Sequence, residues 1–100
     1  MILERLNITQ DDLADFCRKH RIQRMAAFGS VLHTDFGPQS DVDILVEFEP
    51  DATPGWEFFG MAREFSKLVG RPVDMSTFKG IKKSFIHQIL ETAEDVYVAA

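Results

Sequence analysis

Residues 41–49, DVDILVEFE, constrain the fold more than any other stretch of the chain. Apolar side chains recur there at every second position, namely Val42, Ile44, Val46 and Phe48. This period predicts a β-strand with one face on a hydrophobic core. Asp41 and Asp43 open the other face, about 6.6 Å apart along the strand and pointing the same way. Because each of two neighbouring carboxylates opposes ionisation of the other, the pair needs a partner that removes the conflict.

Helical and strand patterns alternate around this predicted strand. Helical periodicity covers residues 9–20, 56–69 and 82–94, and shorter strand-like runs cover residues 22–28, 71–77 and 95–99. The stretch GPQS at 37–40 is typical of a turn. A chain of 100 residues has room for one domain. We therefore predict a single domain over residues 1–100, of the α/β or α+β class, with a small mixed sheet flanked by helices.

Each predicted helix has an apolar side. In the first helix it consists of Leu13, Phe16, Cys17 and His20. In the second it consists of Phe58, Met61, Ala62, Phe65, Leu68 and Val69, and in the third of Phe85, Ile86, Ile89, Leu90 and Ala93. Thr9 followed by Asp12 resembles a capping box at the start of the first helix. Gly70 followed by Pro72 predicts the end of the second helix.

The composition excludes several classes of protein. Hydrophobic residues make up 45% of the chain and charged residues 27%, which is typical of a globular protein and not of a disordered one. A formal net charge of −5 gives no long-range attraction to a phosphate backbone and argues against direct nucleic-acid binding. The sequence shows neither an apolar run of membrane-spanning length nor the apolar core of a signal peptide. Cys17 has no partner for a disulfide, so we expect a cytoplasmic protein in which Cys17 is a core residue and not a nucleophile.

Asp74 is a third candidate acid. It lies in the predicted strand 71–77, where its neighbours Val73 and Met75 are expected to point to the opposite face. Mg²⁺ prefers carboxylate oxygens together with substrate phosphates. Asp41, Asp43 and Asp74 are therefore candidate metal ligands and catalytic residues.

Gly29 and Ser30 follow the predicted strand 22–28. If a short helix begins here, its backbone N–H groups face incoming anions. Glycine lets a phosphate approach the backbone closely, and the Ser30 hydroxyl can donate a hydrogen bond to it. A phosphate site beside three acids predicts nucleotidyl or phosphoryl transfer. Each motif alone has a simpler explanation, since alternating acids occur on exposed strands and Gly-Ser occurs in ordinary turns; the combination favours the functional one.

The motifs resemble a known family at this point. Gly29-Ser30, then ten residues, then Asp41-Val42-Asp43 is similar to the signature of minimal nucleotidyltransferases of the DNA polymerase β-like superfamily. The resemblance extends through ILVEFEP, LVGRPVDMST and ILETAEDVY, nearly the whole chain. It implies a mixed sheet flanked by helices. It also implies that Gly29 and Ser30 hold the triphosphate of ATP and that Asp41 and Asp43 bind two Mg²⁺. Asp74 would bind one of these ions and help to activate the acceptor hydroxyl.

The resemblance further implies a biological role. Many proteins of this kind are antitoxins paired with a HEPN-domain toxin, an RNase, and some neutralise it by transferring AMP to a tyrosine of the toxin. The family often has a basic residue and a glycine after Gly-Ser, where this chain has Leu32, His33 and Thr34. His33, when protonated, is the candidate for a phosphate contact at this place.

Two alternatives stay open. The departure at His33 and Thr34 is compatible with an antitoxin that neutralises the toxin by binding, without chemistry. A nucleotidyltransferase for a small hydroxylated molecule would instead need a pocket made with a second domain or in a dimer. We therefore expect the protein to act in a homo- or hetero-oligomer.

Overall fold

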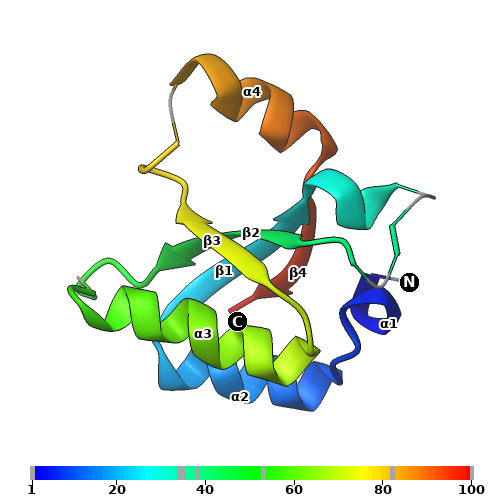
Figure 1. Cartoon of the computed structure of the whole chain (residues 1–100). Coiled ribbons are helices and arrows are strands. Elements are labelled where there is room, and N and C mark those ends of the chain that lie inside the picture. The colour runs from blue at the N-terminus through cyan, green and yellow to red at the C-terminus, as the bar shows by residue number, and fades with distance from the viewer. Residues whose placement is uncertain (1, 34–35, 38, 53, 82, 100) are drawn as a thin grey trace.

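A four-stranded mixed sheet forms the centre of the fold in the described part of the chain (Figure 1). The computed structural model describes residues 2–33, 36–37, 39–52, 54–81 and 83–99. Its strands are β1 (Ile22–Phe28), β2 (Val42–Phe48), β3 (Val73–Thr77) and β4 (Glu94–Val98), in the spatial order β3-β2-β1-β4. β1 runs antiparallel to both β2 and β4, whereas β2 and β3 are parallel. The predicted α+β class with a mixed sheet is confirmed.

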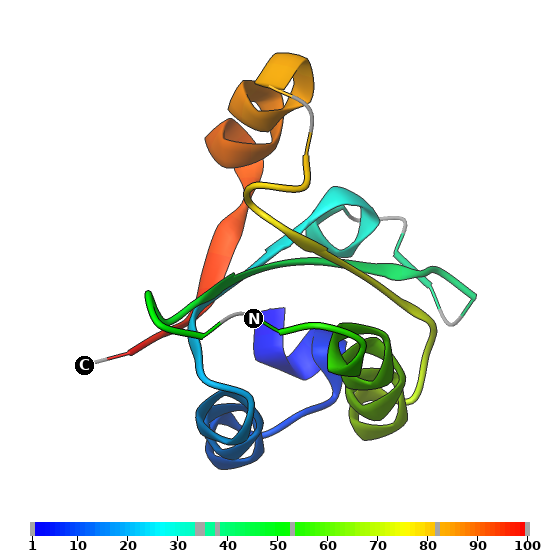
Figure 2. The same cartoon turned by 90° about the vertical axis from the view of Figure 1, so that its left-hand side faces the viewer.

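The helices divide between the two faces of the sheet. The helices α1 (Ile2–Leu6), α2 (Gln10–Lys19) and α3 (Glu57–Val69) lie together on one face. The short 3₁₀ helix η1 (Gly29–Leu32) and α4 (Lys83–Thr92) lie on the other side (Figure 2). None of these helices has the length and apolar character that a membrane span requires, as far as the described residues go.

The core fills the space between the sheet and α1–α3. Its buried members come from α1–α3, from all four strands and, at Val31, from η1: Leu6, Leu13, Phe16, Cys17, Ile22, Met25, Ala27, Val31, Val42, Ile44, Val46, Met61, Phe65, Val69, Met75 and Val96. The alternation predicted for β2 is thus confirmed at Val42, Ile44 and Val46. Leu45 and Ala26 are paired across β2 and β1 and are also buried, but they lie outside this cluster because they point to the opposite face.

The predicted helix ends are also confirmed. The Thr9 hydroxyl oxygen accepts a hydrogen bond of 3.1 Å from the backbone N–H of Asp12 and so caps α2. Gly70, with φ of 75°, ends α3 in the left-handed conformation that glycine adopts most easily. Within the predicted turn 37–40, the Ser40 N–H donates to the Gly37 carbonyl over 3.0 Å; Pro38 lies outside the described residues.

Three features differ from the expectations. The short helix α1 has no counterpart among the predicted elements, because five residues are too few to show a helical period. Leu68, predicted on the apolar side of α3, is 41% exposed. No residue of α4 is buried, and Phe85 and Leu90 on its apolar side are 54% and 42% exposed. The reason is that α4 stands clear of the sheet, so its apolar side meets no layer of the described chain (Figure 2).

Two leucine substitutions test this assignment of the core. Leu13 is fully buried and Leu68 is exposed, so Leu13→Ala should lower the free energy of unfolding by about 2–5 kcal/mol. Leu68→Ala should lower it by less than about 1 kcal/mol. Urea unfolding followed by circular dichroism measures both. Equal losses for the two variants would contradict the packing of α2 and α3 described above.

Candidate active site

Three strands meet in register where the predicted site residues lie. Phe28, the last residue of β1, pairs with Asp43 of β2, and Asp43 pairs with Asp74 of β3. Residues paired across neighbouring strands project from the same face of a sheet. Asp43 and Asp74 therefore lie side by side, on the face opposite the core. The structure brings these two predicted residues together although thirty-one positions separate them in the sequence.

Gly29 makes room for the Asp43 carboxylate. The chain turns at Gly29 with φ of 76°, a conformation that residues with a Cβ rarely adopt. A Cβ added to Gly29 would lie 2.4 Å from Oδ2 of Asp43, much closer than non-bonded atoms approach. The glycine is thus required both by its backbone angle and by the neighbouring carboxylate, which sits directly against the backbone of the predicted phosphate loop.

Ser30 and Asp41 complete this corner of the sheet. The Ser30 hydroxyl donates a hydrogen bond of 3.1 Å to the backbone carbonyl of Asp41. Asp41 precedes β2 and is exposed. The Gly29-Ser30 corner is therefore in direct contact with both acids of the D-x-D motif, with the side chain of Asp43 and with the backbone of Asp41.

His33 lies at the end of η1. Its backbone N–H donates to the Ser30 carbonyl over 3.0 Å, and its side chain is exposed to solvent. His33 is therefore not part of the core, and it directly follows the Gly29–Leu32 segment that is predicted to bind phosphate. Thr34 lies outside the described residues. Phosphate binding by His33 stays a prediction.

Burial and negative charge act together on Asp43. Partial burial raises the pKa of the Asp43 carboxyl, and the charges of Asp74 and then Asp41 raise it further. The charges of both other predicted acids therefore act on Asp43. The conflict that the sequence suggested for Asp41 and Asp43 exists in the fold, and Asp74 adds to it.

The donor set suits a hard divalent cation. The described residues contain no group of three His, Cys, Asp or Glu side chains gathered closely enough to hold a metal ion unaided. Mg²⁺ does not need such a cage, since it commonly binds one or two carboxylates and completes its shell with water and substrate phosphates. Asp43 and Asp74 offer carboxylate oxygens whose mutual repulsion a cation would relieve. These residues fit a Mg²⁺–nucleotide complex better than a metal held by protein alone.

Other titratable residues are accounted for by structure. Burial raises the pKa of the Cys17 thiol to about 12, so Cys17 is a protonated core residue, as predicted. His20 follows the last residue of α2, and its ring nitrogen lies 3.1 Å from a carboxylate oxygen of Glu64 on α3. This contact joins two helices and belongs to the fold.

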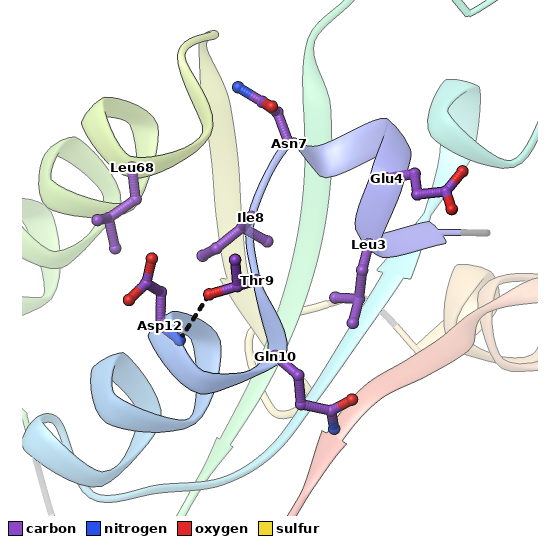
Figure 3. A pocket seen from close by; sticks show the side chains of 8 residues that line it. All are labelled: Leu3, Glu4, Asn7, Ile8, Thr9, Gln10, Asp12 and Leu68. Carbon is purple, nitrogen blue, oxygen red and sulfur yellow. Dashed lines mark hydrogen bonds between the residues drawn. The ribbon is translucent and has the colours of Figure 1, made fainter.

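A separate hollow lies on the helical side of the molecule (Figure 3). Its volume is about 460 Å³, and it is lined by Leu3, Glu4, Asn7, Ile8, Thr9, Gln10, Asp12 and Leu68. The Thr9–Asp12 capping bond lies on its wall. None of the predicted site residues lines this hollow, so it is distinct from the corner at Gly29.

Comparison with known proteins identifies the family. Residues 12–96 match the family described as "Nucleotidyltransferase domain". The chain belongs to this family and is a nucleotidyltransferase. The matched region contains all six predicted site residues.

Curated relatives of this nucleotidyltransferase come from Methanocaldococcus jannaschii. The protein named "Putative protein adenylyltransferase MJ0128" is 33% identical over 92 residues, which cover 83% of this chain and 92% of that protein. "Putative protein adenylyltransferase MJ1379" is 30% identical over 74 residues, which cover 73% of this chain and 74% of that protein.

Solved structures share the fold. One described as "Structure of putative minimal nucleotidyltransferase" has a TM-score of 0.74 at 29% identity and covers 94% of this chain and 95% of its own. A "toxin-antitoxin with AMP-PNP" gives a TM-score of 0.75 at 16% identity, covering 92% of this chain and 75% of that one. A complex of a "tri-AMPylated Shewanella oneidensis HEPN toxin" with an MNT antitoxin gives 0.69 at 15% identity, covering 99% and 74%. The last two similarities concern the fold alone. The family match and the first of these structures confirm the predicted relationship to minimal nucleotidyltransferases.

Two arginines hold the backbone around this site, and neither was predicted from the sequence. Arg5 of α1 donates to the backbone carbonyls of Val31 and His33, and Arg71 donates to those of Gly37 and Ser40. Contacts to carbonyl oxygens place no demand on the type of the accepting residue. They therefore leave no spacing or composition signal in the sequence.

Gly29→Ala tests whether the approach of Asp43 to the loop matters for function. Gly70 is a matched control, because its φ of 75° is nearly the same but a Cβ there would meet nothing within 4 Å. Both alanine variants should lose about 1–2 kcal/mol of stability through the left-handed backbone. Only Gly29→Ala forces the Asp43 carboxylate to move. A shift of about 1 Å in a catalytic group should reduce nucleotidyl transfer by about 10²-fold. Similar activity of the two variants, measured alongside their unfolding free energies, would refute the role assigned to this contact.

Asp43→Asn tests the electrostatic conflict. Because the folded-state pKa of Asp43 is raised, the folded protein binds this proton more tightly, and stability falls as pH rises through the window above the unfolded pKa. Asparagine cannot ionise, so the variant should be more stable than the parent at pH 7, by at most about 1 kcal/mol. The gain should vanish at acidic pH, where Asp43 is protonated.

Asp51→Asn provides the control of opposite sign. A hydrogen bond from Arg21 lowers the pKa of Asp51, so its stabilising effect is present at neutral pH and is lost as pH falls. Thermal unfolding of both variants between acidic and neutral pH should give differences of opposite sign. If Asp43→Asn is less stable than the parent at pH 7, the destabilising effect assigned to the Asp43 charge is wrong.

Proposed function

We propose that this nucleotidyltransferase transfers AMP from ATP to a tyrosine hydroxyl of a HEPN-domain toxin and thereby acts as its antitoxin. The observation that carries the proposal is the corner where the Asp43 carboxylate lies against Gly29 and beside Asp74. The names of the Methanocaldococcus jannaschii relatives support protein as the acceptor class. The solved toxin–antitoxin complexes with the same fold support a HEPN toxin as the partner.

Each predicted residue has a role in this reaction. Gly29 and Ser30 would bind the triphosphate through backbone N–H groups and the Ser30 hydroxyl, with His33 as a further phosphate contact. Asp41, Asp43 and Asp74 would hold two Mg²⁺ ions. When bound, the ions neutralise charge on the phosphates and on the three carboxylates.

The chemical step is a displacement at the α-phosphorus. The tyrosine oxygen forms a bond to the α-phosphorus, and the bond from that phosphorus to the oxygen bridging to the β-phosphate breaks. Pyrophosphate leaves with the electron pair of the broken bond. Asp74, at the exposed start of β3, would receive or direct the proton of the tyrosine hydroxyl. Asp74 is exposed on the edge strand β3, which leaves room for an acceptor side chain to approach from solvent.

The shape of the molecule supports an acceptor on a separate protein. The site lies on the face of the sheet opposite the core, away from the layer of α1–α3 (Figure 2). Large apolar side chains are exposed elsewhere on the described surface: Trp56, Phe59, Phe85 and Leu90. Trp56 and Phe59 lie beside each other, with ring centroids 6.3 Å apart, and contiguous exposed apolar patches are typical of surfaces that meet another protein. A cytoplasmic location, which the unpaired Cys17 suggests, forms part of the proposal.

An antitoxin that acts by binding alone is the second candidate. Its support is the departure at Leu32, His33 and Thr34, where the family often has a basic residue and a glycine. A nucleotidyltransferase for a small hydroxylated molecule would need a pocket completed by another chain. A homodimer with a cleft shared between subunits would favour that alternative.

The decisive experiment combines the chain with a candidate HEPN-domain toxin, ATP and Mg²⁺. Intact-mass spectrometry should show the toxin gaining one or more AMP units, and peptide mapping should place them on tyrosine. Asp41→Ala and Asp43→Ala should reduce this modification by about 10²-fold or more while the fold is kept. Asp11→Ala, an exposed acid on α2 remote from the site in sequence and element, is the matched control and should modify the toxin like the parent.

The same mixture separates the alternatives. Neutralisation of the toxin without ATP, and by the Asp41 and Asp43 variants, would support binding alone. Transfer of AMP to a small hydroxylated compound but not to the toxin would support the third candidate. Either result would refute protein adenylylation as the function.

A further inference from the structure

We propose that Arg71 is a positioning residue that holds Asp41 in place for catalysis; the inference rests on the proposed nucleotidyl-transfer site. Asp41 needs such a residue because it precedes β2 and is exposed. Its own backbone is not part of the paired register that runs from Val42 along β2 and β3. The ladder that fixes Asp43 and Asp74 therefore does not fix Asp41.

The Arg71 side chain holds the residues just before Asp41. Its Nη1 donates hydrogen bonds to the backbone carbonyls of Gly37 and Ser40, the latter over 3.2 Å. The guanidinium carbon lies 4.3 Å from the ring centroid of Phe36. One side chain thus contacts three described residues of the segment that leads to Asp41, including its immediate neighbour.

The Arg71 backbone is itself held at the start of β3. The Ser66 hydroxyl of α3 donates to the Arg71 carbonyl over 2.6 Å. The carbonyl of the next residue, Pro72, accepts a hydrogen bond of 2.9 Å from the Val42 N–H. Arg71 therefore spans from the segment that carries Asp74 to the segment that carries Asp41, and it couples the separation of these two acids to the packing of α3.

The chemistry of the guanidinium group explains why an arginine is suited to this place. A planar guanidinium can donate to two carbonyl oxygens and stack on an aromatic ring at the same time, whereas an ammonium group cannot do both in a fixed geometry. Ser30 holds Asp41 from the other side through its carbonyl. Without Arg71, the backbone of Asp41 would be held only on its Val42 side, by the Ser30 hydroxyl on the Asp41 carbonyl and by the Val42 N–H on Pro72. Partners of this kind, which hold a metal ligand without touching the metal, affect metal affinity or activity by about 10–100-fold.

The first test needs neither metal nor substrate. In Arg71→Gln the amide of Ser40, which donates to the Gly37 carbonyl, should exchange hydrogen with solvent at least about 10-fold faster than in the parent. The amides of β1 should exchange at the parental rate, which shows that the fold is kept. Arg71→Lys should behave like Arg71→Gln at Ser40, because an ammonium group cannot donate to both carbonyls and stack on the Phe36 ring in one fixed geometry.

The second test is a titration of Mg²⁺ at fixed ATP, with binding read by calorimetry and transfer read by mass. Arg71→Gln should raise the Mg²⁺ concentration for half-maximal binding by about 10-fold or more, and kcat should fall while KM for the acceptor is unchanged. Arg24→Gln is the matched control. Arg24 likewise has an aromatic partner, Phe78 at 4.9 Å, and a hydrogen bond, to Asp95 over 2.8 Å, but it lies in the first half of β1, whereas Gly29 follows the last residue of that strand.

The outcomes distinguish this inference from the proposed function. If the parent protein binds ATP with Mg²⁺ but modifies no protein, the proposed acceptor is wrong. The role of Arg71 is then tested by hydrogen exchange at Ser40 and by Mg²⁺ binding alone. Parental exchange at Ser40 and parental Mg²⁺ dependence in Arg71→Gln would overturn the positioning role. If Arg71→Gln does not fold, Arg71→Lys decides by the same two measurements, and parental values there would overturn the role as well.

Discussion

The contact between the Asp43 carboxylate and the backbone at Gly29 is the feature on which the rest of the site depends. It exists because the last residue of β1 pairs with Asp43, so the chain must turn at the position directly beside that carboxylate. A side chain at residue 29 would occupy the space of Oδ2. The turn, the missing Cβ and the acid are thus one geometric unit, and a phosphate bound at the turn would meet a carboxylate-bound cation at short range.

This arrangement costs stability in the absence of a ligand. Asp43 is partly buried beside two other acids, and its pKa is raised by burial and by both charges. Residues kept for function commonly destabilise the fold in this way. A cation that removes the repulsion between the carboxylates would gain that free energy on binding. At Asp51 the shift has the opposite direction, because a hydrogen bond from Arg21 lowers the pKa of that carboxyl. The two acids therefore differ in their surroundings, since Asp43 lies beside other carboxylates and Asp51 beside a guanidinium group.

The two faces of the sheet carry the core and the candidate site. Val42, Ile44 and Val46 face α1–α3 and make the core, whereas Asp43 and Asp74 face away from it. Substitutions on one face can change activity with little effect on packing on the other, because strand side chains alternate. An open face of this kind would let an acceptor on a separate protein reach the site without entering a closed pocket, as the proposed function requires.

The sequence by itself determined the local elements, the D-x-D pair and the Gly-Ser turn, because period and residue type record which backbone conformation and which face each position takes. It predicted Asp74 as a third acid from its place in a strand, yet the partner of that strand and its parallel register were decided only by tertiary pairing. The exposure of the α4 side chains and the roles of Arg5 and Arg71 were equally invisible in the sequence. Burial and backbone hydrogen bonds depend on which segments meet in space, and the pattern along one segment carries no information about its neighbours.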